Sequence, residues 1–142
     1  MSLTPCIHLS FNGQCEAAFK HYERSLGGTI ESLFRYGGSP AAAEAPPGWD
    51  AKIMHAAISI GGTLIMGSDV SPDRYERPQG FQVLLQLHDA AEAERVFAAL
   101  AENGTVDMPL QKTFWAERFG VVRDQFGIPW SINCDAATQS VA

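Results

Sequence analysis

Residues 6–28 read CIHLSFNGQCEAAFKHYERSLGG, and this stretch decides the fold. Between Ile7 and Phe11 apolar and more polar residues alternate, and this period of two predicts a strand with one buried face. From Cys15 onward the apolar residues recur with spacings of three and four, which predicts an amphipathic helix. The glycine pair that begins at Gly27 predicts the end of that helix. A strand followed by a helix is therefore the first expected unit.

The same order returns in residues 81–104, FQVLLQLHDAAEAERVFAALAENG. Alternating residues again predict a strand, and the pair Asp89 and Glu92 has the spacing of a capping box at a helix start. Three short strands are expected after each helix. In the first half they are expected at 29–36, 53–60 and 63–67, and in the second half at about 105–112, 118–123 and 128–134.

The two halves predict an α+β fold built of two βαβββ modules. We expect a single domain over residues 1–142, with module one at about 4–69 and module two at about 80–134. One such module cannot cover its own sheet, whereas two can form one curved, mixed, largely antiparallel sheet around a concave cavity, with a helix of each half on the convex side. By the alternation, the side chains expected to face the cavity are Cys6, His8, Ser10, Gln82, Leu84, Gln86 and His88.

A loop is expected at residues 37–50, which read GGSPAAAEAPPGWD. This segment is too rich in glycine, proline and alanine to pair well in a sheet. A loop of this length with no structure of its own is uncommon unless it is functional. Trp49 is therefore a candidate anchor or lid residue.

Charge and cysteine content narrow the class of protein. Ten Lys and Arg residues stand against sixteen Asp and Glu residues, which gives a formal net charge of −6 at pH 7. An acidic chain without a basic cluster is poorly suited to bind nucleic acid or an anionic membrane. The N-terminus lacks the features of a signal peptide, and three cysteines without a CxxC pair suit a reducing compartment. We therefore expect a soluble, cytoplasmic protein with no nucleic-acid or membrane partner.

Four stretches of the chain carry a family resemblance. They are FNGQCEAAFKHY at 11–22 with LGG at 26–28, IMHA at 53–56, IMGSD at 65–69, and FWAERFGVVRDQFGIPW at 114–130, which is the most specific. Together they resemble the PhnB-like branch of the vicinal oxygen chelate superfamily, which includes glyoxalase I, extradiol dioxygenases and bleomycin-resistance proteins. The similarity runs from about residue 4 to 134. It implies a glyoxalase-like fold and a homodimer.

The resemblance also implies where a metal would bind. In the metal-using members, four cavity-facing side chains, typically His and Glu, bind one divalent ion, and they come from the first and fourth strands of each module. The matching positions here are Cys6, or His8 if the register slips by two, with Met66, Gln82 and Ser131. None of them is a carboxylate, which oxygen-preferring ions require. We therefore do not favour a divalent metal cofactor, and any other cofactor is unknown.

Candidate site residues follow from the expected cavity face. His8 and His55 lie on the polar faces of their strands and are either hydrogen-bonded lining residues or catalytic acid–base or metal-binding groups. The other expected ligand-binding side chains are Ser10, Ser59, Gln82 and Gln86, with Trp115 and Arg118 at the cavity mouth. Arg118 is alternatively half of a surface ion pair with Glu117.

The sequence also predicts the burial or the local role of three further residues. Cys6 is either a small buried thiol or a nucleophile. His21 falls on the polar side of the first helix and is expected at the surface. Asp124 is expected to serve the turn at 124–127.

Two functions fit these observations. The first is a PhnB-like small-molecule binding protein whose ligand occupies the concave cavity without the usual metal. The second is a metal-dependent lyase, isomerase or dioxygenase of the glyoxalase I type. A methyltransferase, a label often given to PhnB-like sequences, is not supported, because no Gly-x-Gly-x-x-Gly motif follows a predicted strand.

Overall fold

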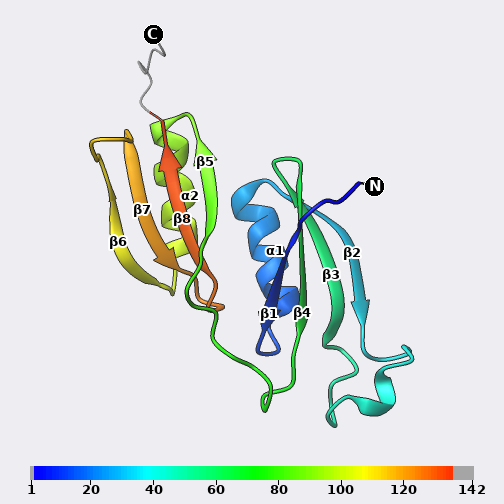
Figure 1. Ribbon diagram of the computed structural model, residues 1–142. Coiled ribbons are helices and arrows are strands. Elements are labelled where there is room, and N and C mark those ends of the chain that lie inside the picture. The colour runs from blue at the N-terminus through cyan, green and yellow to red at the C-terminus, as the bar shows by residue number, and fades with distance from the viewer. Residues whose placement is uncertain (1, 136–142) are drawn as a thin grey trace. The chain divides into compact units, whose positions relative to one another are not determined.

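The computed structural model describes residues 2–135 (Figure 1). The chain divides into two compact units, Met1–Glu76 and Arg77–Ala142. Each unit holds one of the two expected modules, so the division falls in the connector between them. That the two modules make up a single domain stays a prediction.

Module one has the order strand, helix and three strands. Its elements are β1 (Ile7–Phe11), α1 (Cys15–Leu26), β2 (Thr29–Arg35), β3 (Ile53–Ile60) and β4 (Thr63–Asp69), with a short 3-10 helix, η1 (Ala42–Glu44), between β2 and β3. The strand order in the sheet is β1-β4-β3-β2. Strand β1 runs parallel to β4, and the other neighbours are antiparallel.

Module two repeats this plan. Its elements are β5 (Val83–Leu87), α2 (Ala90–Ala101), β6 (Thr105–Gln111), β7 (Arg118–Arg123) and β8 (Pro129–Cys134), and its strand order is β5-β8-β7-β6. The predicted α+β fold of two βαβββ modules is confirmed. Within residues 2–135, however, the strands form two sheets of four instead of one curved sheet. In each module the fourth strand uses its outer edge to pair with that module's own first strand, which completes a sheet inside the module.

Each helix packs closely on one face of its own sheet. In module one the ring of Phe19 in α1 meets Phe11 edge-on, with centroids 5.9 Å apart. Gly67 permits this approach, because a β-carbon there would lie 2.8 Å from Phe19 Cζ. In module two a β-carbon on Gly120 would lie 2.8 Å from Phe97 Cε2. The helix positions expected to pack on the sheets are all buried: Ala18, Tyr22, Ala93 and Phe97.

The carboxylate of Asp69, at the end of β4, is buried and joins three segments of module one. Its Oδ1 accepts a hydrogen bond from the backbone N–H of Cys15 at 2.8 Å, and its Oδ2 accepts one from the N–H of Ile53 at 2.8 Å. The N-cap residue Gln14 makes no side-chain cap of its own. Asp69 therefore satisfies an N–H group at the start of α1 that would otherwise lack a partner.

Module two uses acidic side chains in two local roles that the sequence predicts. Asp89 caps α2, because its Oδ2 accepts a hydrogen bond from the N–H of Glu92 at 3.0 Å. Asp124 serves its turn: its Oδ1 accepts from the N–H groups of Phe126 at 2.8 Å and Ile128 at 3.0 Å. Its Oδ2 also accepts from the indole Nε1–H of Trp130 at 2.9 Å, which ties the turn to β8. Both predictions are confirmed.

One expectation about burial is wrong, that for His21, and the buried alternative for Cys6 is excluded. Cys6 is exposed, because it precedes β1 and lies outside the ladder that covers the strand. His21 is buried, with its ring 6.2 Å from that of Tyr22. The cause is that α1 contacts β2 as well as β3 and β4, so its inner face is wider than the apolar stripe alone indicates.

Glu16 of α1 and Arg35 at the end of β2 form a paired hydrogen bond across module one. The two guanidinium nitrogens of Arg35 donate to the two carboxylate oxygens of Glu16 at 2.9 Å and 2.8 Å. The ammonium nitrogen of Lys20, one helical turn further along α1, lies 3.1 Å from Oε2 of Glu16. The hydrogen bonds from Arg35 and then from Lys20 lower the pKa of Glu16 to about 2.

We expect Asp69→Ala to destabilise the protein strongly. The variant leaves two N–H groups without their acceptor, and each such loss costs about 1–3 kcal/mol, so the free energy of unfolding should fall by about 2–6 kcal/mol. Urea denaturation followed by circular dichroism measures this change. Asp107→Ala, at an exposed position of β6, is the matched control and should change the stability by less than about 0.5 kcal/mol. Equal effects of the two substitutions would contradict the role of Asp69.

Acid should destabilise the protein partly through Glu16. Its pKa of about 2 in the folded chain lies below the ordinary value of 4.5, so the stabilisation is present above about pH 4.5 and is lost as the pH falls toward 2. Unfolding free energies between pH 2 and 6 should therefore fall less steeply for Glu16→Gln than for the unsubstituted protein. Glu31→Gln, at an exposed position of β2, should follow the unsubstituted protein. Identical slopes for Glu16→Gln and the unsubstituted protein would rule this contribution out.

Candidate functional site

The sheet face of module one that lies away from α1, here called the open face, carries most of the expected polar site residues. Along β1 the residues Leu9 and Phe11 are buried toward α1, so His8 and Ser10 lie on the open face. The register pairs His8 with Met66, and Met66 with Ala57. His55 and Ser59 lie two residues to either side of Ala57 and therefore share the open face. The structure thus brings His8, Ser10, His55 and Ser59 onto one surface.

The two histidines of the open face lie close enough to affect each other. Desolvation of the ring, and then the neighbouring His55, lower the pKa of His8 below its ordinary value. The imidazole Nε2 of His8 lies 3.4 Å from the hydroxyl of Ser68. A lowered pKa keeps the ring of His8 neutral near pH 7, so that it can accept a hydrogen bond or a proton from a bound molecule.

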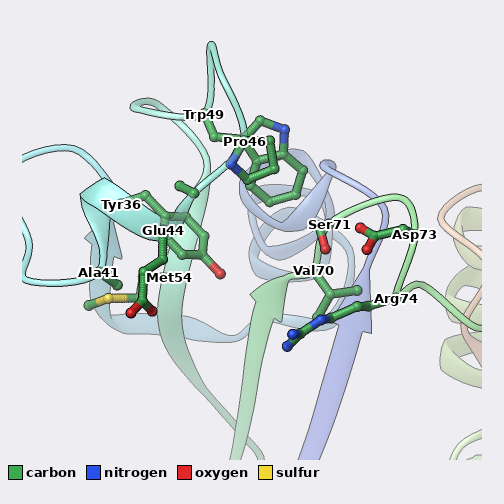
Figure 2. A pocket seen from close by; sticks show the side chains of 11 residues that line it. Tyr36, Ala41, Glu44, Pro46, Trp49, Met54, Val70, Ser71, Asp73 and Arg74 are labelled. Atoms are coloured by element: carbon green, nitrogen blue, oxygen red, sulfur yellow. The ribbon is translucent and has the colours of Figure 1, made fainter.

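A pocket of about 520 Å³ lies beside the open face, under the loop of residues 37–50. We call it the Trp49 pocket. Figure 2 shows Trp49 and Pro46 on one side of it, near Tyr36 and Glu44, with the segment from Val70 to Arg74 opposite. The rings of Tyr36 and Trp49 pack edge to face with centroids 5.7 Å apart. Its walls are formed by Tyr36, Ala41, Glu44, Ala45, Pro46, Trp49, Met54, Val70, Ser71, Asp73 and Arg74.

Backbone and side-chain hydrogen bonds hold the walls of the Trp49 pocket in place. The hydroxyl of Tyr36 donates to the backbone oxygen of Asp69 at 3.0 Å. The N–H of Lys52 donates to the carbonyl of Trp49 at 2.9 Å, and the N–H of Gly37 donates to the carbonyl of Asp50 at 2.9 Å. The ends of the loop are therefore joined to each other, and Trp49 is anchored at its base.

A bulge brings Met54 into the wall of the pocket. Strand β2 pairs Phe34 with His55 and then Arg35 with Ile53, so Met54 has no partner on β2. Ile53 is buried and Arg35 reaches Glu16 of α1, which places both on the helix side. The extra residue at Met54 leaves its side chain free to line the pocket next to His55.

The structure separates Trp115 from Arg118. Trp115 packs against Phe119 with ring centroids 5.3 Å apart. Arg118 instead donates from Nε to the carboxylate of Glu94 in α2 at 3.2 Å. A second guanidinium nitrogen of Arg118 lies 3.3 Å from the carboxylate of Glu117. Because neighbouring side chains of a strand point to opposite faces, Arg118 lies on the helix side of β7 and Phe119 on the other. The expected pairing of Trp115 and Arg118 at one cavity mouth is therefore replaced by an ion pair of Arg118.

The two glutamines differ in their surroundings. Gln82 precedes β5 and is exposed. Gln86 donates from Nε2 to the carboxylate of Asp135 at 2.8 Å, and its Oε1 accepts from Nδ2 of Asn133 at 2.9 Å. Asp135 also pairs with His88 at 2.9 Å. The amide of Gln86 thus already has protein partners on both of its polar atoms.

Comparison with known proteins assigns the family. The model of the Glyoxalase/Bleomycin resistance protein/Dioxygenase superfamily matches residues 8–132. The chain belongs to this superfamily. Protein YjdN of Escherichia coli (strain K12) is 39% identical over 141 residues, which cover 94% of this chain and 95% of YjdN.

Two solved structures are similar to this chain. The crystal structure of protein PA1353 from Pseudomonas aeruginosa is 45% identical and has a TM-score of 0.85, with 94% of this chain and 98% of that one covered. A PhnB protein from Bacillus cereus, described as a putative 3-demethylubiquinone-9 3-methyltransferase, is 24% identical with a TM-score of 0.80, over 93% of this chain and 99% of that one. The second likeness shows the fold. The predicted membership of the superfamily is confirmed.

The register shows which first-strand residues lie beside the two expected fourth-strand positions. In module one β1 and β4 pair His8 with Met66, and in module two the equivalent ladder pairs Leu84 with Ser131. The residues beside Met66 and Ser131 are thus His8, which is one of the two expected alternatives, and Leu84, which is not among the expected ligands; the assignment of Cys6 and Gln82 stays a prediction. Leu84 has no donor atom, and a thioether and a hydroxyl are poor ligands for the oxygen-preferring ions. This set does not fit the divalent ion that the superfamily implies.

Other parts of the described chain offer no substitute for that set. Within residues 2–135 no group of three or more His, Cys, Asp and Glu side chains is placed to hold a metal ion.

Within the described residues no helix is long and apolar enough to cross a membrane. The homodimer and the cytoplasmic location stay predictions.

Six residues of the Trp49 pocket lie outside the predicted 37–50 loop and were not singled out as site residues. They are Tyr36, Met54, Val70, Ser71, Asp73 and Arg74. Arg74 lies in the connector after β4, where no periodicity marks one side as inward. The single available signal was Trp49, a large aromatic residue in an otherwise small-residue loop.

We expect no tight metal binding at the superfamily's positions. Isothermal titration of chelator-treated protein with Mg²⁺, Mn²⁺, Ni²⁺ and Zn²⁺ should show no dissociation constant below about 1 µM, where a complete site would release about 8 kcal/mol or more. His8→Ala is the diagnostic variant, since His8 is the best donor of the four. Saturable, stoichiometric binding that His8→Ala abolishes would contradict this prediction.

Proposed function

We propose that this protein binds a small organic molecule in the Trp49 pocket without a divalent metal at the superfamily's ligand positions. The observation that carries the proposal is the pocket itself, about 520 Å³ in volume, with two aromatic rings and a few charged groups in its walls. Binding sites for small molecules typically measure about 300–1,000 Å³ and combine apolar walls with a few polar groups.

The position of the pocket supports binding beside the open face. Met54 lines the pocket and is followed directly by His55 on β3. A ligand that lies against Tyr36 and Trp49 would extend from the pocket toward the histidines of the open face. His8 and His55 would then contact its polar part, in the lining role that the sequence predicts for them.

The alternative of a metal-dependent lyase, isomerase or dioxygenase has less support. It requires ligands that Met66 and Leu84 do not provide. Methyl transfer, named for the Bacillus cereus relative, also lacks support here, since that likeness shows the fold and this chain has no Gly-x-Gly-x-x-Gly motif after a strand. A fold alone does not decide between activities.

Ligand-detected NMR with a set of small aromatic and acidic fragments tests the proposal. Fragments should bind the unsubstituted protein, and Trp49→Ala should weaken the hits about tenfold, because stacking on an aromatic side chain is worth about 1 kcal/mol or more. Phe114→Ala removes a highly exposed ring of module two and is the matched control. Hits that survive Trp49→Ala but disappear in Trp115→Ala would move the site to module two and overturn the proposal.

A further inference from the structure

We infer that the Trp49 pocket takes a small aromatic zwitterion, whose carboxylate is bound by Arg74 and whose ammonium group faces Glu44. This inference rests on the proposed function and names its ligand class. It follows from the charged side chains in the pocket wall and from which of them already have a partner in the protein.

Arg74 stands in the pocket with its hydrogen-bond donors unused. Within residues 2–135 its guanidinium makes no hydrogen bond and no ion pair. Three other arginines are engaged by the protein itself: Arg35 binds Glu16, Arg118 binds Glu94, and Arg123 donates to two backbone carbonyls. A planar guanidinium presents paired donors that match the two oxygens of a carboxylate.

Two backbone hydrogen bonds fix the turn that carries Arg74. The N–H groups of Arg74 and Tyr75 both donate to the carbonyl of Ser71, at 2.9 Å and 3.0 Å. The side chain of Asp73, next to Arg74, is hydrogen-bonded by Ser71, and this bond is the main cause of the lowered pKa of Asp73. Asp73 therefore remains charged and is held by its own turn, which leaves Arg74 available to a ligand.

Glu44 supplies the opposite charge from the loop. It ends η1, where its N–H donates to the carbonyl of Ala41 at 3.1 Å. Within the described residues its carboxylate also makes no hydrogen bond or ion pair. Glu44 and Arg74 belong to different segments of the wall, the loop and the connector, as Figure 2 shows. Each would gain a partner from a ligand that carries both charges.

The charge balance of the wall selects among ligand types. Glu44 and Asp73 are negative and Arg74 is positive, so the wall carries one excess negative charge. A doubly charged anion such as a phosphate ester would face two carboxylates of its own sign and a single cation, and is therefore disfavoured. A zwitterion adds no net charge and pairs one group with each free side chain. Its aromatic part would lie against Tyr36 and Trp49, whose ring planes are inclined by 66° to each other.

A set of matched probes tests the three elements of this inference separately. Phenylalanine carries ring, carboxylate and ammonium; 3-phenylpropanoate lacks the ammonium, phenethylamine lacks the carboxylate, and alanine lacks the ring. Dissociation constants are measured by NMR titration of the full chain. Phenylalanine should bind about tenfold or more tightly than each of the other three, because a hydrogen bond to a charged group is worth about that factor.

Variants assign each charge to its residue. Arg74→Met should weaken phenylalanine and 3-phenylpropanoate about tenfold and leave phenethylamine unchanged, whereas Glu44→Gln should weaken phenylalanine and phenethylamine and leave 3-phenylpropanoate unchanged. Arg77→Met and Glu31→Gln, outside the pocket wall, are the matched controls and should bind like the unsubstituted protein.

The outcomes separate this inference from the proposed function. If 3-phenylpropanoate or phenethylamine binds as tightly as phenylalanine, or if Arg74→Met and Glu44→Gln leave all probes unaffected while Trp49→Ala weakens them, the zwitterion inference fails and the pocket remains a binding site. If no aromatic probe or fragment depends on Trp49, the proposed function fails as well.

Discussion

The buried carboxylate of Asp69 holds together the parts of module one on which both the fold and the pocket depend. One oxygen binds the first turn of α1 and the other binds the start of β3, while the backbone oxygen of the same residue accepts the hydroxyl of Tyr36. Burial, and then the negative charges of Asp69 and Glu16, raise the pKa of the Cys15 thiol well above its ordinary value. The thiol therefore stays protonated and adds no second negative charge beside Asp69. Because Tyr36 lines the Trp49 pocket, the residue that seats the helix also positions a wall of the candidate site.

The elements of the fold could be predicted because their signals are local. The alternation from Ile7 to Phe11 and the capping pair at Asp89 both lie within one element, and the structure confirms them. The pairing of the strands is not local. The parallel ladder that sets His8 beside Met66 joins segments separated by most of module one, and a slip of two residues keeps every side chain on the same face. The sequence therefore predicted the correct face but placed the first-strand position at Cys6 as readily as at His8.

The candidate site was harder to predict because it depends on a bulge and on loops. Tyr36, Met54 and Arg74 come from three separate segments, and the side chain of Met54 reaches the pocket through the register shift between β2 and β3. An aromatic ring with a cation was expected at a cavity mouth, but at Trp115 and Arg118, and that expectation stays a prediction. For Arg118 a signal was available: Gly120 and Val122 alternate with it along β7, and both face α2.

The two modules share their packing but not the chemistry of their open faces. Both seat an aromatic ring of the helix over a glycine of the sheet, with Phe19 over Gly67 and Phe97 over Gly120. On the open faces the equivalent positions diverge, since His8 of module one corresponds to Leu84 of module two, and Met66 corresponds to Ser131. The helix side supplies the buried apolar area that stabilises each module, so substitutions on the open face change little of that area. The same plan can therefore carry two histidines on this face in module one, and Leu84 and Phe119 beside the hydrogen-bonded pair Gln86 and Asn133 in module two.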